Sequence, residues 1–115
     1  MGGASVKRGE VRWHTLRSPD KHRPVLILTR DSAIEVLTGI TVAPITSTIR
    51  DIPTEVMLTP AEDGILTESA VNLDNLQTIS KANLGGLIAI LSAAKMEAVE
   101  NGICFALGVD RYFFT

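Results

Sequence analysis

The 115-residue sequence predicts a single α+β domain, a mostly antiparallel sheet with one helix packed on it at the C-terminal end. Short runs rich in β-branched residues, separated by turn residues, follow one another over most of the chain, and such strands pair with their sequence neighbours. Helical spacing is clear only after residue 92. Together these patterns favour a partly closed barrel with one covering helix.

The first half of the chain predicts three strands. Residues 9–16 alternate apolar and polar side chains, which indicates a half-buried strand. Residues 24–29 form a continuous apolar run, typical of a central strand buried on both faces, and Pro24 is expected at its first position. Residues 39–45 predict the third strand. Between the last two, Asp31-Ser32 would cap a short helical turn that runs to Leu37.

The second half predicts four more strands and the helix. The strands are expected over 54–58, 70–73, 76–79 and 87–91, with a turn at 61–64 and another at Gly85-Gly86. Ser92 is a good N-cap, Leu91 and Met96 are placed as a hydrophobic staple, and Gly108 suits the residue after the helix. Gly102 weakens this prediction, and Cys104 is expected to be a small buried hydrophobe. The predicted buried stripe is Met96, Val99, Ile103 and Leu107.

The charges are distributed unevenly along the chain. Residues 1–30 contain seven basic and two acidic residues, a balance of +5, whereas the remainder contains four basic and eleven acidic residues, a balance of −7. A basic stripe of this kind can bind phosphate even when the whole chain is acidic, although a solvated strand face explains the charges equally simply.

Several classes of protein are disfavoured. No apolar run approaches the ~18 residues of a membrane span, and the N-terminus lacks the order of a signal peptide. Residues 1–6 are therefore interpreted as a disordered leader or a remnant of cloning. The single cysteine excludes an intrachain disulfide and suits the cytoplasm. The two histidines lack zinc-ligand spacing, and no metal site or cofactor is expected.

Three polar clusters follow predicted strands or precede them. Arg23, after His22, stands at the entry to the apolar strand, and a guanidinium there can bind phosphate through two N–H groups. Thr46, Ser47 and Thr48 follow another strand, where their hydroxyls bind phosphate or cap local backbone. Amides in the third cluster can read base edges, although they are equally common in turns. The third cluster comprises Asp74, Asn75 and Gln77.

Four stretches in this order resemble the MazF/PemK family of toxin endoribonucleases. They are residues 7–13 (KRGEVRW), 22–28 (HRPVLIL), 42–47 (VAPITS) and 71–79 (VNLDNLQTI). With the C-terminal helix, the likeness covers residues 7–108, which are interpreted as the endoribonuclease domain. It leaves an aromatic tail at 109–115, for which packing onto the domain or a dimer is expected. The resemblance implies a MazF/CcdB-type, SH3-like barrel sheet with a C-terminal helix.

The resemblance also implies which residues act. The family's active-site arginine falls on Arg23, its threonine on Thr46 and, in some members, an acidic residue on Asp74. RNA cleavage would proceed by attack of the 2′-hydroxyl on its own phosphate, without a metal, to give a 2′,3′-cyclic phosphate and a 5′-hydroxyl. The residues expected to bind the RNA are His22, Ser47, Thr48, Asn72, Asn75, Gln77, Arg17 and Lys21.

The implied partners are single-stranded RNA, a second copy of the chain, and a MazE-like antitoxin whose disordered C-terminal segment folds onto the RNA site. Two features depart from the family pattern. The loop 16–21 is short, and Asn72 stands where some members carry a catalytic arginine. The alternative is a CcdB-like, non-enzymatic gyrase poison of the same fold. Its characteristic Trp-Gly-Ile ending is replaced here by Phe113-Phe114-Thr115, which disfavours it.

Overall fold

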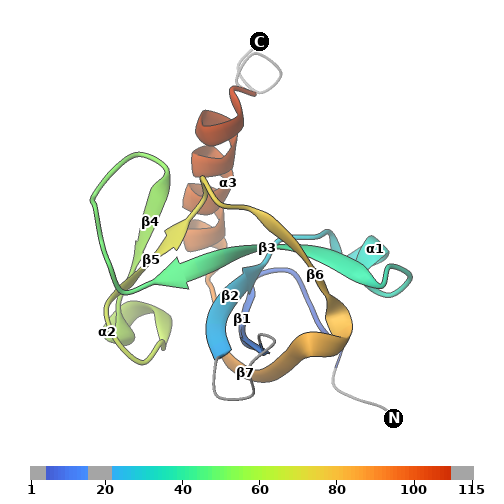
Figure 1. Ribbon diagram of the computed structural model, residues 1–115. Coiled ribbons are helices and arrows are strands. Elements are labelled where there is room, and N and C mark those ends of the chain that lie inside the picture. The colour runs from blue at the N-terminus through green and yellow to red at the C-terminus, as the bar shows by residue number, and fades with distance from the viewer. Residues whose placement is uncertain (1–4, 16–21, 110–115) are drawn as a thin grey trace.

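In the computed structural model, which describes residues 5–15 and 22–109, a curled antiparallel sheet is covered on one side by a long helix (Figure 1). This arrangement confirms the predicted α+β class. The strands are β1 Glu10–Thr15, β2 His22–Ile27, β3 Gly39–Thr46, β4 Glu55–Leu58, β5 Ser69–Asn72, β6 Gln77–Ser80 and β7 Leu84–Ile90. The helices are α1 Asp31–Ile34, α2 Pro60–Asp63, the 3-10 turn η1 Lys81–Asn83 and α3 Ala93–Leu107.

The sheet curls because one long strand, β3, pairs with two different strands, β6 and β5, along the same edge. The strand order is β4-β5-β3-β2-β1-β7, and β6 pairs with β3 outside this path. The first half of β3 pairs with β6, whereas its last residues pair with β5. Strands β6, β3, β2, β1 and β7 therefore bend round into a partly closed barrel, and β4 and β5 extend away from it (Figure 1).

The central strand β2 is buried on both faces, as its apolar sequence predicts. Leu26 and Leu28 belong to the core beneath α3, whereas Val25 and Ile27 belong to a second core inside the curl. The expected first position for Pro24 is wrong, because it is the third residue of β2. Proline is tolerated there because β2 pairs with β3 only from Val25 onward, so Pro24 has a strand partner on one side only, in β1.

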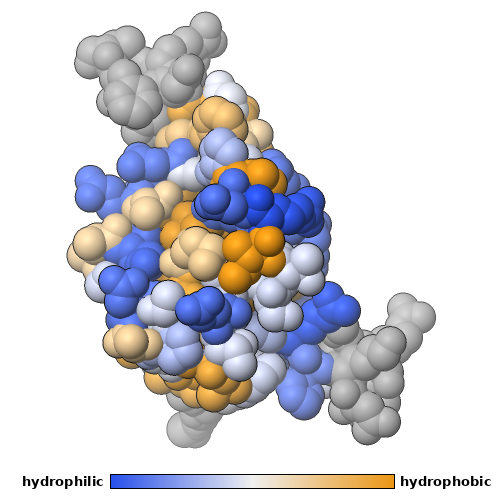
Figure 2. All heavy atoms as spheres, turned by 90° about the vertical axis from the view of Figure 1, so that its left-hand side faces the viewer, coloured by the Kyte–Doolittle hydropathy of each residue, from blue (hydrophilic) through white to orange (hydrophobic). Residues whose placement is uncertain are grey.

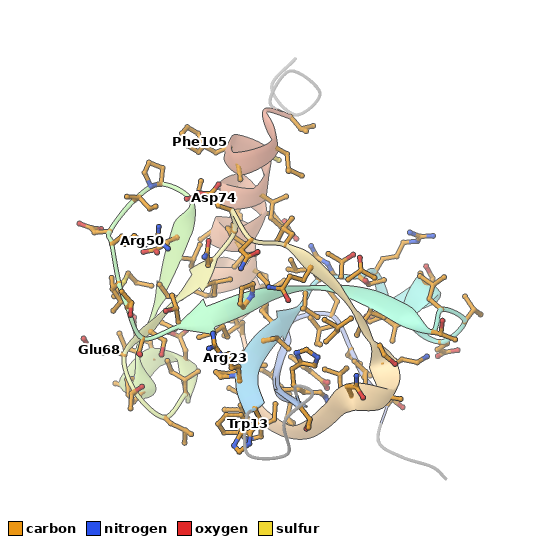
Figure 3. The ribbon with its side chains drawn as sticks, in the orientation of Figure 1. Trp13, Arg23, Arg50, Glu68, Asp74 and Phe105 are labelled. Carbon is orange, nitrogen blue, oxygen red and sulfur yellow. The ribbon has the colours of Figure 1, made fainter. Side chains whose placement is uncertain are left out.

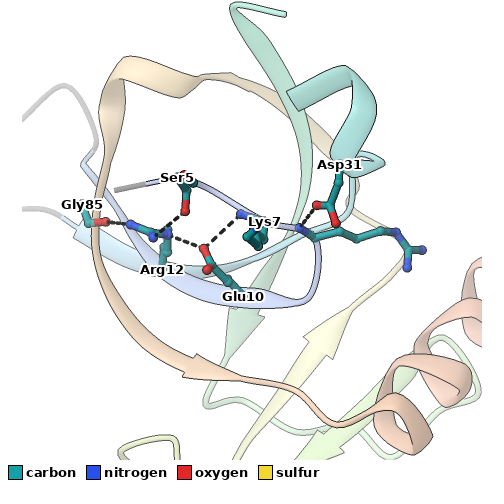
Figure 4. A network of polar contacts seen from close by, with 7 residues as sticks. Ser5, Lys7, Glu10, Arg12, Asp31 and Gly85 are labelled. Carbon is teal, nitrogen blue, oxygen red and sulfur yellow. Dashed lines mark hydrogen bonds and ion pairs between the residues drawn. The ribbon is translucent and has the colours of Figure 1, made fainter. Parts of the chain in front are cut away.

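Arg12 does not lie on a solvated strand face. It is 7% exposed, and its Nε donates to Glu10 Oε1 at 2.7 Å. Its other nitrogens donate to the carbonyl oxygens of Gly85 and Ser5 (Figure 4). A buried ion pair of this kind needs such extra hydrogen bonds to offset the loss of hydration. Arg12 thus ties β1 to β7 and to the N-terminal segment, and this part of the basic N-terminal third is structural.

The structure describes the N-terminal segment from Ser5 onward. Val6 packs against the core inside the curl, although residues 1–6 had been interpreted as a disordered leader. The Lys7 backbone N–H donates to Glu10, and the Arg8 backbone N–H donates to Asp31 (Figure 4). Residues 5 and 6 therefore belong to the folded domain, and residues 1–4 lie outside the described residues.

Gly85 and Gly86 lie within β7 and not in a turn, contrary to the sequence-based expectation. Arg12 is opposite Leu87 and His14 is opposite Leu84, so β7 contains one more residue than β1 between these two pairs. This extra residue is a β-bulge, a feature that increases the local twist of a strand. The glycine pair therefore helps the sheet to curl.

Two short helices also differ from the prediction. Helix α1 ends at Ile34, and its N-cap is Arg30, without a capping side chain. Asp31 does not cap it, because its Oδ1 accepts the backbone N–H of Arg8 at 2.7 Å. The turn expected at 61–64 is the single-turn helix α2, which Thr59 caps through the N–H of Glu62.

Helix α3 begins and ends as predicted. Ser92 accepts the N–H of Lys95 at 3.1 Å, and Gly108 adopts the left-handed conformation after the last turn. Gly102 is required by packing, because a Cβ there would clash with Leu73. The expected stripe is too long, since Leu107 is 59% exposed and only Met96, Val99 and, in part, Ile103 are buried.

The outer side of α3 leaves apolar side chains in contact with solvent. Phe105 is 64% exposed, and it lines a pocket of about 960 Å³ together with Met57 of β4 and residues of α2. Figure 2 shows this face, on which apolar side chains are set between hydrophilic ones. Cys104, expected to be buried, is half-buried.

Candidate functional site

A pocket of about 620 Å³ opens where β2 begins and β3 ends (Figure 3). Its walls include apolar residues such as Pro24 and Ile45, and the remaining lining is rich in hydroxyl, amide and guanidinium groups. We call this pocket the groove. Six of the residues predicted from the sequence line it, namely Arg23, Thr46, Ser47, Thr48, Asn72 and Asn75.

Arg23 and Thr46 reach the groove from neighbouring strands. The β2–β3 pairing ends at Val25 opposite Pro44, and Arg23 and Thr46 each lie two residues beyond that pair and line the groove. The start of β2 and the end of β3 therefore bring a guanidinium and a hydroxyl to one groove.

The guanidinium of Arg23 is available to a ligand. Its side chain is exposed, and no hydrogen bond or ion pair within the described residues engages it. On the other side of β2, Arg23 pairs with His14 of β1. Arg23 is thus held at its backbone by β1, next to a proline that fixes the following φ angle, and among the described residues its planar fork has no other partner.

Thr46 fits both roles that its sequence context allows, because it caps local backbone and also lines the groove. It is half-buried, and its Oγ1 accepts the backbone N–H of Thr48 at 3.0 Å. A hydroxyl that accepts in this way still has its own proton to donate. The local bond fixes the rotamer of Thr46, and the O–H remains as a donor on the groove.

Asp74 does not line the groove. Its Oδ2 accepts the hydroxyl of Thr54 at 2.6 Å, and its backbone N–H donates to Asn72 Oδ1 at 3.1 Å. Figure 3 shows Asp74 near α3, beyond Arg50 and far along the sheet from Arg23. The structure therefore brings Asn72 and Asn75 to the groove. It does not bring Asp74 there, nor Gln77, which is exposed on β6.

His22 is exposed and does not line the groove, but it contacts a residue that does. Its ring stands edge-on to Trp13, with the ring centroids 4.7 Å apart and the planes at 88°. Trp13 lines the groove, a position that the alternating pattern of its strand did not reveal. Such a ring offers a surface on which a base can stack. Arg17 and Lys21, two further predicted RNA contacts, lie outside the described residues.

Arg50 is the second residue of the groove that sequence reasoning missed. It follows the polar run at Thr46 by four residues, in the segment between β3 and β4. Its side chain is 61% exposed, and its Nε lies 3.8 Å from Glu55 Oε2. The groove therefore holds two guanidinium groups, which makes it suited to a polyanion.

Burial affects one titratable group beside the site. Desolvation lowers the pKa of His14 below its ordinary value of 6.5, so the imidazole opposite Arg23 is held in its neutral form over a wider pH range. Among residues 5–15 and 22–109, no cluster of three His, Cys, Asp or Glu side chains is placed to hold a metal ion. No helix in the same ranges is long and apolar enough to span a bilayer.

Comparison with known proteins connects this geometry to named relatives. Residues 7–107 match the family model of PemK-like, MazF-like toxins of type II toxin–antitoxin systems. A probable endoribonuclease MazF5 of Mycobacterium tuberculosis is 43% identical over 104 residues, which are 90% of this chain and 94% of the relative. The endoribonuclease MazF3 of the same species is 45% identical over 91 residues, or 79% and 87% of the two chains.

Solved structures share the fold. The Mycobacterium tuberculosis toxin MazF-mt6 is 42% identical and superposes with a TM-score of 0.78, covering 88% of this chain and 98% of its own. An endoribonuclease from mycobacterial species, solved in complex with its cognate antitoxin, is 28% identical with a TM-score of 0.80, over 91% and 97% of the two chains. The curled half-barrel with its C-terminal helix is the fold of these toxins. The chain therefore belongs to the family of PemK-like, MazF-like toxins of type II toxin–antitoxin systems.

Proposed function

We propose that this chain is the toxin of a toxin–antitoxin system and acts as an endoribonuclease on single-stranded RNA. The observation that carries this proposal is that Arg23, near the start of β2, and Thr46, at the end of β3, line one polar groove. Relatives named as MazF endoribonucleases support it. The CcdB-like alternative is not favoured, because the matched family and the named relatives are MazF-like toxins.

In the proposed reaction the nucleophile belongs to the substrate. The 2′-oxygen of the RNA forms a bond to the adjacent phosphorus, and the bond from phosphorus to the 5′-oxygen breaks. The products are a 2′,3′-cyclic phosphate and a 5′-hydroxyl, the 2′-hydroxyl proton being lost and the leaving oxygen gaining one. Negative charge grows on the phosphoryl oxygens, and Arg23 and Thr46 donate hydrogen bonds to it there, where preorganised donors lower the barrier most.

No metal ion or other cofactor is part of this proposal. Arg23 supplies the positive charge that a metal would otherwise supply, and DNA is excluded as a substrate because it lacks the 2′-hydroxyl. Trp13 offers a stacking surface for a base, and the amides of Asn72 and Asn75 offer donors and acceptors for base edges. Ser47 and Thr48 add hydroxyls along the same wall. The single half-buried thiol, Cys104, suits a cytoplasmic protein.

Two protein partners complete the proposal. The first is an antitoxin whose disordered segment folds across the groove. A solved relative in complex with its cognate antitoxin supports this partner, and the two guanidinium groups of the groove suit an acidic peptide. The second is another copy of the chain. The exposed apolar residues beside α3, such as Phe105 and Met57, supply surface that such an interface would bury.

The test of the activity is incubation of the purified protein with a long single-stranded RNA in the presence of EDTA. We expect defined fragments with 2′,3′-cyclic phosphate and 5′-hydroxyl ends, and no cleavage of DNA of the same sequence. Loss of cleavage in EDTA that magnesium or manganese restores would contradict the metal-independent mechanism. Inhibition of DNA gyrase without RNA cleavage would favour the CcdB-like alternative.

A further inference from the structure

The segment between β3 and β4, residues 47–54, carries Arg50 to the groove that already holds Arg23 and Thr46. Figure 3 shows Arg23 and Arg50 on either side of the end of β3. Because the side chain of Arg50 is 61% exposed, its charged end can meet a ligand in solution. The two guanidinium groups therefore flank the strand end at which Thr46 presents its hydroxyl.

Glu55 holds this segment in place from the first residue of β4. Its side chain is 1% exposed, and its Oε1 accepts the backbone N–H groups of both Arg50 and Asp51, at 2.9 and 3.2 Å. Asp51 has a φ of 56°, in the left-handed region that costs energy for most residues. The two hydrogen bonds to Glu55 offset that cost, and they fix the backbone from which the Arg50 side chain projects.

The second oxygen of Glu55 orients the guanidinium. Oε2 is buried, makes no hydrogen bond within the described residues, and lies 3.8 Å from Arg50 Nε. A buried carboxylate is costly unless a positive charge compensates it. Glu55 thus attracts the Nε edge of Arg50. The two terminal nitrogens then remain for a ligand, and their N–H groups can bind a phosphate through two parallel hydrogen bonds.

We propose that Arg50, positioned by Glu55, binds a phosphate of the RNA that neighbours the cleaved one. This inference rests on the proposed function. The charge of Glu55 offsets that of Arg50, whereas no carboxylate within the described residues pairs with Arg23. Arg23 is therefore better suited to the charge that develops during the reaction, and Arg50 to a phosphate whose charge stays constant. Arg50 contributes to RNA affinity and to the register of the strand in the groove.

The experiment begins by mapping a cleavage site in a long RNA with the wild-type protein. A short RNA containing that site, with 2′-deoxyribose at the attacking nucleotide, then measures affinity without cleavage. For Arg50→Ala we expect Kd to rise on the order of 10- to 100-fold, the loss typical of a charged hydrogen-bonded contact. The slope of log Kd against log salt should become shallower by about 0.7, the value for one phosphate contact on a single strand. The single-turnover rate at saturating RNA should fall much less for Arg50→Ala than for Arg23→Ala.

Three further variants test the planar fork of Arg50, its positioning by Glu55 and the specificity of the effect. Arg50→Lys should keep the salt slope and bind more weakly than wild type, because an ammonium lacks the planar fork. Glu55→Gln should weaken binding by raising Kd, because the Nε edge loses its charged partner. Arg30→Ala removes an exposed guanidinium that does not line the groove, and it should leave both the affinity and the salt slope unchanged.

Two results would overturn the inference while leaving the proposed function intact. One is a wild-type Kd and salt slope for Arg50→Ala. The other is a loss of single-turnover rate for Arg50→Ala as large as that for Arg23→Ala, which would place Arg50 at the cleaved phosphate instead. A wild-type protein that neither cleaves nor binds RNA would overturn the proposed function itself, and that outcome is visible before any variant is made.

Discussion

The carboxylate of Asp74 accepts the hydroxyl of Thr54 at 2.6 Å, and this bond joins the turn after β5 to the residue just before β4. Thr54 is 7% exposed, so its hydroxyl has little access to water as a substitute partner. The turn that Asp74 holds carries Asn75 and follows Asn72, both of which line the groove. Asp74 thus positions the amides of the site from outside it.

Asp74→Ala is expected to lower stability and to leave the chemical step nearly unchanged. Leaving a buried hydroxyl unpaired costs about 1 kcal/mol or more. Thr54→Val should cost a similar amount, and the double variant should cost less than the two losses added together, as for partners in one bond. Urea unfolding and single-turnover cleavage measure the two effects. If Asp74→Ala stopped cleavage without loss of stability, Asp74 would be a proton acceptor in the reaction.

Arg23→Ala should nearly abolish cleavage and leave the fold intact. Loss of one preorganised donor to a developing oxyanion typically slows a reaction on the order of 100- to 1000-fold, and here the positive charge is lost as well. Arg23→Lys should also be slow, because a point charge does not reproduce two parallel N–H groups. The measurement is single-turnover cleavage of a labelled RNA with thermal melts of each variant. Arg30→Ala serves as the control, and a large fall in melting temperature for Arg23→Ala would indicate a structural role instead.

Thr46→Ala should slow cleavage less than Arg23→Ala does. Thr46 is a single neutral donor to the developing charge, and loss of one such donor typically slows a reaction on the order of 100-fold or more, whereas Arg23 supplies two donors and a positive charge. Thr46→Ser keeps both the donor and the acceptor that binds the Thr48 N–H, so it should cleave close to the wild-type rate. Equal losses for the serine and alanine variants would show that the methyl group matters, and not the hydroxyl.

Gly102→Ala should destabilise the protein, even though alanine is the better helix former. The added Cβ would clash with the Cδ1 end of the Leu73 side chain, and because Leu73 is 1% exposed, that side chain has to repack within the core. Overpacking of this kind costs about 1 to 3 kcal/mol, which exceeds the gain of about 1 kcal/mol in helix propensity. Asn101→Ala, at the adjacent exposed position, is the matched control and should not destabilise. Chemical denaturation of the two variants decides the comparison.

The parts of the fold that the sequence predicts are those governed by local pattern. The continuous apolar run before Leu28 marks a strand buried on both faces, and Ser92 and Gly108 mark the two ends of α3. The burial of Arg12 was missed because it depends on Gly85 and Ser5, which other segments bring to it. One local signal was available, since Glu10 and Arg12 are two apart and share a strand face.

The residues of the candidate site that lie at strand ends could be predicted from the sequence, and those in irregular segments could not. Arg23 and Thr46 stand in motifs whose order resembles a known family, and the fold then brings both to one groove. Arg50 lies in an irregular segment, where no periodicity says which way a side chain projects. Its placement depends on hydrogen bonds from that segment to Glu55, and a sequence does not display such bonds.

The last prediction concerns pH. Desolvation lowers the pKa of folded His14 below 6.5, the ordinary value that we take for the unfolded chain. Above pH 6.5 both states carry neutral imidazole, and the full stability is present. As pH falls below 6.5, the unfolded chain binds a proton that the folded protein binds only at lower pH, so the unfolding free energy falls. His14→Gln should remove this component. Urea unfolding at several pH values below and above 6.5 measures the slope, and identical slopes for wild type and His14→Gln would contradict the prediction.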